Sequence, residues 1–387
     1  MKVVCVNYTF SRSLTDPDVL LDRYETLVGW ADGLKSAGAS VAVIQRFGAN
    51  ATRSRHDISY RFVADPSRKD GSLFDRATSV NAAVDSEHPD LVHINGLPFA
   101  RQASRLKRVL NVPFLIQDHA GLPPRRWLAR RTIGRALQEM DAVSFVSREQ
   151  ARPWLDAGLL QGRQRIVELM EGSSRFVLKS REAARAQTGL TGDPLCLWVG
   201  RLDANKDPIT VLRGFATALP TLPRARLAMV YSADALLPEV RGWLAQNSRV
   251  AGCVELLGQR PHDALEDFFN SADLFVLGSH HESAGYSVLE ALACGVTPIV
   301  TNIPSFRVLT GEGKMGALWP VEDSGALAQA LVAQQSRLHP ESRKEIRTFF
   351  DDNFHWNQIG RQALEVYQAL ERGGGVVPDP KRRDRSP

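Results

Sequence analysis

The feature that most constrains the fold is a regular alternation of short apolar runs with longer segments of helical periodicity. The pattern begins with the apolar residues 3–6 and continues through residues 20–34, where apolar residues recur at helical spacing before Gly38. Further apolar runs lie at residues 41–44, 91–94, 114–116, 143–146, 166–170, 195–199, 227–230, 254–257, 274–277 and 298–300. Most successive runs are separated by enough chain for a crossover helix, which parallel strands require. The sequence therefore predicts parallel, doubly wound α/β sheets.

The alternation pauses at residues 171–174 and resumes after a charged stretch, which divides the chain into two domains. We place an N-terminal Rossmann-like domain at residues 1–172 and a C-terminal Rossmann-like domain at residues 173–345. A helix is predicted over residues 346–371 and is expected to pack back toward the N-terminal domain. Residues 372–387 are predicted to form a flexible tail, because their Gly, Pro and charge content cannot bury a core.

Composition excludes several other classes of protein. The four cysteines lie far apart with no C-x-x-C pair, so neither a disulfide framework nor a cysteine zinc site is indicated. No apolar run approaches the ~20 residues of a membrane helix, and the apolar start of the chain is too short for a signal peptide. We therefore expect a cytoplasmic protein.

Positive charge is concentrated between residues 101 and 135, which hold nine basic residues and one acid, Asp118. The whole chain carries a formal net charge of only +5, so the remainder is net acidic. Local charge of this kind points to a site or a surface, and we expect no nucleic-acid partner. Within this region the segment Arg125–Arg135 interleaves arginines with Trp127 and other apolar residues. It is either an amphipathic helix in peripheral contact with an anionic membrane or an ordinary surface helix whose apolar residues face the core.

Two cations, Arg201 and Lys206, follow the apolar run 195–199. Asp207 followed by Pro208 is typical of a helix start. The two cations are therefore expected between the carboxyl end of a strand and the amino end of a helix, where open α/β sheets bind ligands. An arginine fork and a lysine point charge suit a diphosphate, although solvated surface charges are the alternative.

Two acids, Glu282 and Glu290, follow the apolar run 274–277. Glu282 is expected in a loop and Glu290 about one turn inside the next helix. Gly285 between them lets a ligand approach the backbone, and the amides of residues 286–288 form a helix amino terminus that attracts phosphate oxygens. A carboxylate beside a phosphate site is repulsive unless it accepts hydrogen bonds from ligand hydroxyls, and sugar hydroxyls are the obvious donors. Taken singly, each acid is equally well a solvent-facing charge.

With these residues in place, the sequence resembles the family 4 glycosyltransferases, which have the GT-B architecture of two Rossmann-like domains facing a cleft. The resemblance spans nearly the whole chain. It is strongest in GRLDANKDP, in the E-x7-E segment from Glu282 with its trailing EALACG, and in GALWPVEDSGALAQAL. It implies a retaining transfer of a sugar from a nucleotide-diphosphate-sugar donor to an acceptor that the sequence does not identify.

The resemblance also assigns roles to residues. Arg201 and Lys206 would hold the diphosphate, Glu282 the donor sugar and Glu290 the ribose hydroxyls. His119 matches a first-domain histidine that faces the donor sugar, although a hydrogen-bonded structural role fits it equally well. The remaining donor-binding positions would be Gly200, Leu257, Gly258, Gly285, Tyr286, Ser287 and Val288, and the segment of Leu257, Gly258 and Gln259 matches the one that lies near the base in the family. The resemblance implies metal-independent catalysis without another cofactor. It also implies that the leaving phosphate itself accepts the acceptor's proton.

One segment departs from the family pattern. The loop after the first apolar run, residues 7–15, lacks the glycine pair often found there, and this loop faces the acceptor side in the family. Two alternatives to a transferase remain on the same architecture, a nucleotide-sugar epimerase and a non-catalytic sugar-nucleotide binder. The joint presence of the two cations and the two acids argues against the silent binder.

Overall fold

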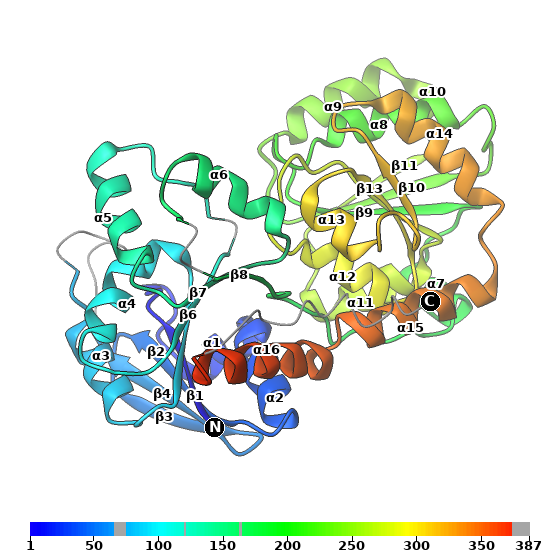
Figure 1. Ribbon diagram of the computed structural model, residues 1–387. Coiled ribbons are helices and arrows are strands. Elements are labelled where there is room, and N and C mark those ends of the chain that lie inside the picture. The colour runs from blue at the N-terminus through cyan, green and yellow to red at the C-terminus, as the bar shows by residue number, and fades with distance from the viewer. Residues whose placement is uncertain (66–74, 120, 162–164, 374–387) are drawn as a thin grey trace, which may run out of the picture. The chain divides into compact units, whose positions relative to one another are not determined.

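The computed structural model describes residues 1–65, 75–119, 121–161 and 165–373, and these residues form two compact units (Figure 1). The first unit comprises Met1–Gly172 together with the C-terminal segment from Trp356, and the second comprises Ser173–His355. The C-terminal domain was predicted to end at residue 345, whereas the second unit continues for one more helical segment. Most of the predicted tail, from residue 374 onward, lies outside the described residues.

The first unit is built on an eight-stranded sheet with the order β3-β4-β2-β1-β5-β6-β7-β8. In chain order the strands are β1 (Lys2–Asn7), β2 (Ser40–Phe47), β3 (Ala51–Arg55), β4 (Ile58–Ala64), β5 (Leu91–Asn95), β6 (Phe114–Gln117), β7 (Ala142–Phe145) and β8 (Arg165–Glu168). All neighbours are parallel except β3 and β4, which form an antiparallel hairpin at the edge. Because β1 lies between β2 and β5, the strand order reverses there, which is where such sheets bind ligands.

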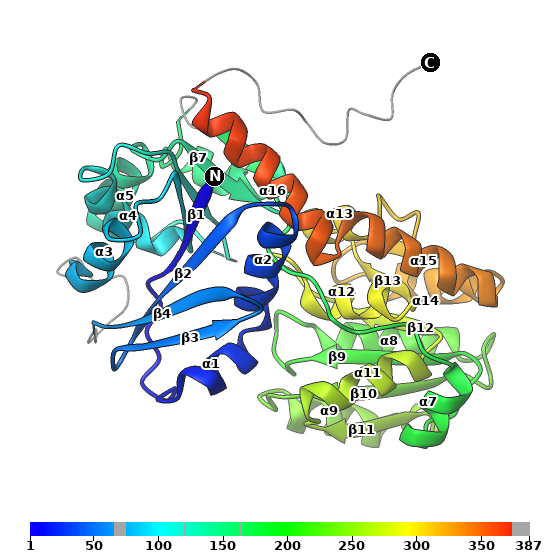
Figure 2. The ribbon, with the colours of Figure 1, turned by 90° about the horizontal axis from the view of Figure 1, so that it is seen from below.

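Helices cover both faces of this sheet. They are α1 (Pro17–Arg23), α2 (Glu25–Ser36), α3 (Thr78–Asp85), α4 (Ala100–Lys107), α5 (Trp127–Leu137), α6 (Arg152–Asp156) and α16 (Trp356–Glu371), with short 3-10 turns η1 (Leu97–Phe99) and η2 (Arg148–Ala151). Successive side chains of β1 point to opposite faces of the sheet. Val4 and Val6 point to one face, where they pack in the core with residues of α3, α4 and α5. On the other face α16 packs against α2 (Figure 2).

The second unit has a six-stranded, wholly parallel sheet with the order β11-β10-β9-β12-β13-β14. The strands are β9 (Leu195–Gly200), β10 (Arg226–Tyr231), β11 (Val254–Gly258), β12 (Leu274–Leu277), β13 (Thr297–Thr301) and β14 (Ala317–Trp319). This is the strand order of a dinucleotide-binding Rossmann sheet, with its reversal between β9 and β12. The predicted fold class, two Rossmann-like doubly wound domains, is confirmed.

Helices also cover both faces of the second sheet. They are α7 (Arg181–Thr188), α8 (Pro208–Ala218), α9 (Leu237–Gln246), α10 (Ser248–Ala251), α11 (His262–Ser271), α12 (Tyr286–Ala293), α13 (Pro304–Leu309), α14 (Ser324–Gln335) and α15 (Pro340–Asn353). Figure 1 shows α8, α9 and α14 on one side of the strands and α7, α11 and α12 on the other. Among the described residues, no helix is long and apolar enough to cross a membrane.

Two predicted helices are each divided in the structure. The periodic segment 20–34 forms α1 and α2, which are separated at Tyr24, whose backbone leaves the helical region at φ −102° and ψ 69°. The segment 346–371 is divided between α15, which ends at Asn353, and α16, which begins at Trp356. Apolar periodicity continued through both breaks, so the sequence pattern did not reveal them.

The close packing of α16 against α2 depends on glycine residues at the contact. A Cβ atom at Gly360 would lie 2.0 Å from the carbonyl oxygen of Gly33, so the two helix backbones are in direct contact. Beside them, Tyr367 of α16 forms a buried hydrogen bond with Nδ1 of His93 on β5. The C-terminal helix is therefore an integral part of the first unit.

Candidate functional site

A cavity of about 510 Å³ opens in the second unit at the carboxyl ends of its central strands. Its lining residues come from the ends of β9 and β10, from the loops after β11 and β12, and from the first turns of α11 and α12. They are Val199, Gly200, Arg201, Asn205, Lys206, Val230, Tyr231, Ser232, Gln259, Arg260, Leu265, Glu282, Tyr286, Ser287 and Glu290. Seven of the predicted site residues thus line one cavity of a size typical for small-molecule ligands.

The turn from β9 to α8 brings the two predicted cations to this cavity. The side chain of Asp207 caps α8 by accepting the Thr210 amide at 3.2 Å, and Pro208 is the first helical residue, which confirms the predicted helix start. Lys206 is largely buried and its Nζ forms an ion pair with Oε1 of Glu282. Arg201 is more exposed and lies 2.9 Å from Asp203.

The loop after β12 and helix α12 supply the two acids. Glu290 lies inside α12 and is buried, with Oε1 accepting a hydrogen bond from His262 Nε2 at 2.8 Å, so it is not a solvent-facing charge. Glu282 remains in the loop and pairs with Lys206. The cavity therefore holds one carboxylate aligned by a histidine and one aligned by a lysine.

Gly285 is the N-cap of α12, and the packing around it requires a glycine at this position. Gly285 is in the left-handed region at φ 75°, and a Cβ atom there would lie 2.6 Å from the ring of Phe306, so packing requires glycine. Val288 is fully buried and its amide donates to the Gly285 carbonyl at 2.9 Å. The Val288 amide is therefore already engaged within the helix, whereas Tyr286 and Ser287 line the cavity.

The segment after β11 reaches the cavity through its last residues. Leu257 and Gly258 end the strand, and Gln259, which belongs to the same matching segment, lines the cavity together with Arg260. Arg260 was not singled out in the sequence, nor were Tyr231 and Ser232 at the end of β10. The rule that ligands bind at the carboxyl ends of parallel strands would have identified all three.

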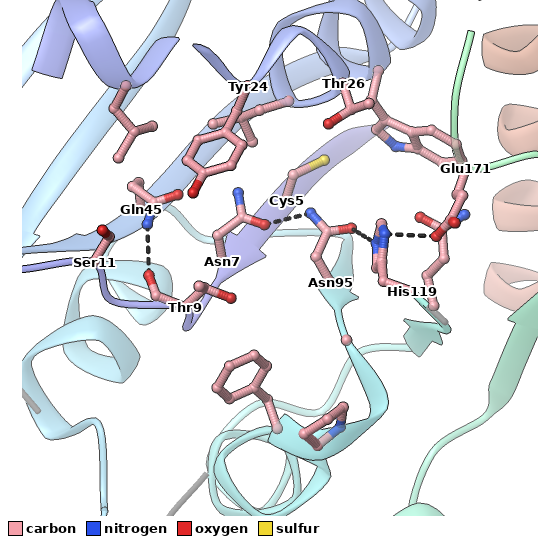
Figure 3. Close-up of a pocket in the computed structure, with 17 residues that line it drawn as sticks. Cys5, Asn7, Thr9, Ser11, Tyr24, Thr26, Gln45, Asn95, His119 and Glu171 are labelled. Atoms are coloured by element: carbon pink, nitrogen blue, oxygen red, sulfur yellow. Dashed lines mark hydrogen bonds and ion pairs between the residues drawn. The ribbon is translucent and has the colours of Figure 1, made fainter. Parts of the chain in front are cut away.

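His119 lies in the first unit, just after β6, and lines a different pocket of about 300 Å³ (Figure 3). Its Nδ1 lies 2.6 Å from Oε2 of Glu171 as an ion pair, and its Nε2 lies 3.3 Å from Oδ1 of Asn95, with which it forms a hydrogen bond. His119 therefore has the polar contacts, with Glu171 and Asn95, that a structural role requires.

Two buried carboxylates surround this histidine. Burial, with a contribution from the neighbouring Glu171 charge, raises the pKa of Asp118 to about 7. Burial alone would lower the pKa of His119, but the charge and hydrogen bond of Glu171, together with Asp118, raise it above its ordinary value. The position of His119 beside Glu171 and Asp118 therefore favours the protonated imidazole.

The sequence analysis missed the polar residues that form the rest of this pocket. Asn7, Gln45, Asn95 and Gln117 each stand directly after one of the predicted apolar runs, and all four line the pocket with Glu171. A polar residue at the end of each of four neighbouring strands is a signal that could have been read from the sequence, since these ends meet at one edge of the sheet.

The basic segment forms helix α5, whose two halves differ in how far their apolar residues are buried. Ile133 and Leu137 are buried against the first-unit core. At its amino end Trp127 is 71% exposed and Leu128 is 44% exposed, next to the exposed arginines of the segment. The core-facing interpretation holds for the second half of the helix and not for the first.

Together, two Rossmann-like units and a cavity lined by paired cations and acids define a GT-B protein. Residues 26–168 match the family model described as Glycosyltransferase Family 4, and residues 180–334 match the model described as Glycosyl transferases group 1. The chain belongs to glycosyltransferase family 4, as its motifs predicted.

Individual relatives agree with this membership. The D-inositol 3-phosphate glycosyltransferase of Rhodococcus opacus (strain B4) is 30% identical over 285 residues, which cover 70% of this chain and 62% of that protein. The chain spans about half the length of several curated relatives it matches, such as 49% of the protein of that name from Thermobispora bispora.

Solved structures show the same fold. Sucrose-phosphate synthase from Thermosynechococcus elongatus superposes with a TM-score of 0.71 at 20% identity, covering 96% of this chain and 100% of that one. HepE from Anabaena, described in complex with UDP and glucose, has a TM-score of 0.69 at 15% identity, with 96% and 100% coverage.

Proposed function

We propose that this chain transfers a sugar from a nucleotide-diphosphate-sugar donor to an acceptor with retention of anomeric configuration, and that the cavity of the second unit holds the donor. The observation that supports this most is the convergence of Arg201, Lys206, Glu282 and Glu290 on one cavity beside the strand reversal. Two cations suit a diphosphate, and two acids suit sugar and ribose hydroxyls.

The catalytic contribution of this cavity is electrostatic. During transfer the bond from the anomeric carbon to the leaving phosphate oxygen breaks and a bond to the acceptor oxygen forms on the same face of the sugar. Negative charge then grows on the leaving diphosphate, where Arg201 and Lys206 stabilise it more strongly in the transition state than in the bound donor. The acceptor's proton passes to the leaving phosphate, so no protein nucleophile is required.

The acids orient the donor. Glu290 would accept hydrogen bonds from the ribose hydroxyls, and its hydrogen bond from His262 fixes the carboxylate for that purpose. Glu282 would hold the donor sugar while remaining within reach of Lys206. These roles follow from the family resemblance together with the positions of both carboxylates in the cavity.

We expect the reaction to be independent of metal ions, because Arg201 and Lys206 supply the positive charge that a divalent cation would otherwise bring to the diphosphate. The expectation is tested by measuring turnover after treatment with EDTA. A loss of activity that Mg²⁺ or Mn²⁺ restores would contradict it.

The donor can be identified by thermal stabilisation with a panel of nucleotide sugars, since a ligand that binds the folded state raises its apparent stability. UDP-sugars come first in the panel, because the similar HepE structure is described with UDP and glucose. Lys206→Ala should abolish the stabilisation. Release of nucleotide that depends on an added acceptor supports the transferase, whereas acceptor-independent conversion of the sugar would indicate an epimerase, which the family matches do not favour.

We also propose peripheral contact of the first unit with anionic membranes at the cytoplasmic face. Leu122 and Trp127 are 66% and 71% exposed beside Arg125 and Arg126, an arrangement that suits insertion at a lipid headgroup boundary. Sedimentation with phosphatidylserine vesicles at low salt tests this, and Trp127→Ala should weaken the binding. Absence of wild-type sedimentation would overturn it.

A further inference from the structure

The pocket of the first unit has an uncharged polar lining. Among its lining residues the only ionisable acid and base near neutral pH are Glu171 and His119, and these two pair with each other. The rest are amides, hydroxyls, one thiol and apolar groups, and the amides are Asn7, Gln45, Asn95 and Gln117. Within the described lining there is no lysine or arginine.

A directed line of hydrogen bonds runs along this pocket (Figure 3). At one end, Nδ1 of His119 lies 2.6 Å from Oε2 of Glu171 as an ion pair. An amide oxygen can only accept, so Nε2 of His119 donates to Oδ1 of Asn95 at 3.3 Å. The Asn95 amide is thereby oriented so that its Nδ2 donates to Oδ1 of Asn7 at 2.6 Å. The oxygen of Asn7 is therefore used within the protein, and its Nδ2 is the group left for a ligand.

Gln117 is oriented like Asn7, with its oxygen used within the protein and its amide NH2 group left without a partner among the described residues. Burial lowers the pKa of His93 to about 3, so this imidazole is neutral, and its Nε2 lies 3.2 Å from Oε1 of Gln117. Tyr367 occupies the other ring nitrogen, which leaves Nε2–H of His93 to donate to Gln117. Both Nδ2 of Asn7 and Nε2 of Gln117 are buried donors without a hydrogen-bond partner in the described structure.

Gln45 presents a hydrogen-bond acceptor to the pocket, whereas Asn7 and Gln117 present donors. Its Nε2 donates to the carbonyls of Thr9 at 2.9 Å and Arg46 at 2.8 Å, so its oxygen is the atom it can present to a ligand. The pocket thus combines two amide donors with an amide acceptor. Hydroxyl groups, which both donate and accept, satisfy this combination, whereas a phosphate can only accept and would bring negative charge toward Glu171.

We propose that this pocket binds an uncharged, hydroxyl-rich acceptor, with Asn7 and Gln117 donating to acceptor oxygens and Gln45 accepting from an acceptor hydroxyl. This inference rests on the proposed function, because a transferase needs a second substrate site besides the donor cavity. The pocket lies at the strand reversal of the first sheet, which is the expected place for that site. It sets this chain apart from relatives that are named for a phosphorylated acceptor, D-inositol 3-phosphate.

The experiment compares matched acceptor probes with the nucleotide sugar that stabilises the protein most. The pairs are myo-inositol with D-inositol 3-phosphate, and glucose with glucose 6-phosphate. Nucleotide release above the acceptor-free rate gives kcat/KM for each probe. We expect the better uncharged probe to exceed its phosphorylated partner by about tenfold or more, since an unpaired buried charge costs several kcal/mol.

The substitution Asn7→Leu then tests whether Asn7 recognises the acceptor. It removes the amide donor at similar volume, and we expect about a tenfold rise in KM for the uncharged probe with little change in donor stabilisation. Asn111→Leu, at an exposed loop position of the same unit, is the matched control and should leave KM unchanged. If Asn7→Leu fails to fold, the probe preference of the wild-type protein remains decisive.

Three outcomes would overturn the inference while leaving the proposed function intact. These are a preference for the phosphorylated probes, a KM that Asn7→Leu does not change, and donor binding with no acceleration by either uncharged probe. If instead no nucleotide sugar stabilises the protein, the proposed function itself fails and this inference fails with it.

Discussion

The cavities of the two units differ in the chemistry of their linings, although both lie at the carboxyl edge of a parallel sheet. The cavity of the second unit is lined by full charges, Arg201 and Lys206 with Glu282 and Glu290. The pocket of the first unit is lined by amides and hydroxyls, with one internal ion pair. Charges recognise a charged ligand and stabilise charge that develops in a reaction, whereas neutral amides discriminate between hydroxyl arrangements. The difference suggests that the second unit activates the donor and the first selects the acceptor.

The largest effect expected from this comparison is the loss of turnover when a cation is removed from the second-unit cavity. Lys206→Ala or Arg201→Ala removes a charge-assisted contact to the leaving diphosphate, and we expect kcat to fall ~30- to ~1000-fold with the fold intact by circular dichroism. Lys314→Ala and Arg213→Ala, at exposed positions of the same unit, are the matched controls. Near-normal rates in both cavity variants would refute the assignment.

The next effect concerns the stability of the first unit and its dependence on pH. The pKa of Asp118 is raised by burial to about 7, so between about pH 4 and pH 7 the unfolded chain holds fewer protons at this group than the folded chain. Folding stability therefore falls as pH rises through this window. Asp118→Asn removes the penalty and should stabilise the protein by about 2 kcal/mol at pH 8, with little gain near pH 4.

Urea unfolding of wild type and Asp118→Asn at pH 5 and pH 8 measures this difference. Asp156→Asn, an exposed acid in the same unit, is the control and should show no pH-dependent gain. A difference between wild type and Asp118→Asn that does not grow with pH would contradict the expected ionisation of the buried carboxyl.

A smaller effect is expected when a cavity acid is neutralised. Glu290→Gln keeps the shape of the side chain but replaces charge-assisted hydrogen bonds by neutral ones, so the Kd of the donor should rise about tenfold. Glu255→Gln, on an exposed position of β11, should leave the Kd unchanged. Titration calorimetry with the identified nucleotide sugar gives both values, and equal affinities would exclude a hydrogen-bonding role for the Glu290 charge.

The smallest effect is a difference in salt dependence between the two substrates. Attraction between a cationic cavity and a diphosphate is screened by salt, so KM for the donor should rise a few-fold between 50 and 300 mM NaCl. KM for an uncharged acceptor should stay nearly constant over the same range. Equal salt dependence of the two constants would remove the contrast between a charged and a neutral site.

Much of the fold could be predicted from the sequence because each buried parallel strand forms a short apolar run. The hairpin of β3 and β4 was missed because the sequence ATRSR of β3 alternates exposed and half-buried polar residues at a sheet edge. The breaks at Tyr24 and before Trp356 were missed because they depend on the geometry of packing and interrupt no apolar pattern.

The two sites differ in how far the sequence identified them. The charged residues proposed to hold the donor lie in two contiguous motifs, around residues 200–208 and 282–290, so the sequence predicted them, whereas the lining residues from β10 and α11 lie outside both motifs. Residues of the other pocket are dispersed from Asn7 to Glu171, and none stands in a recognisable motif. The predicted role of Gly285 as access for a ligand stays a prediction, and the structure adds that packing against Phe306 requires the glycine.

By itself, the sequence determined the parallel α/β architecture, the family and the charged residues of the second unit, because periodicity and contiguous motifs are local properties of the chain. Only the tertiary structure decided that Glu290 is buried against His262, that α16 completes the first unit, and that four strand ends place Asn7, Gln45, Asn95 and Gln117 around one pocket. These features depend on contacts between distant segments, and the direction of each amide is set by partners that folding brings together.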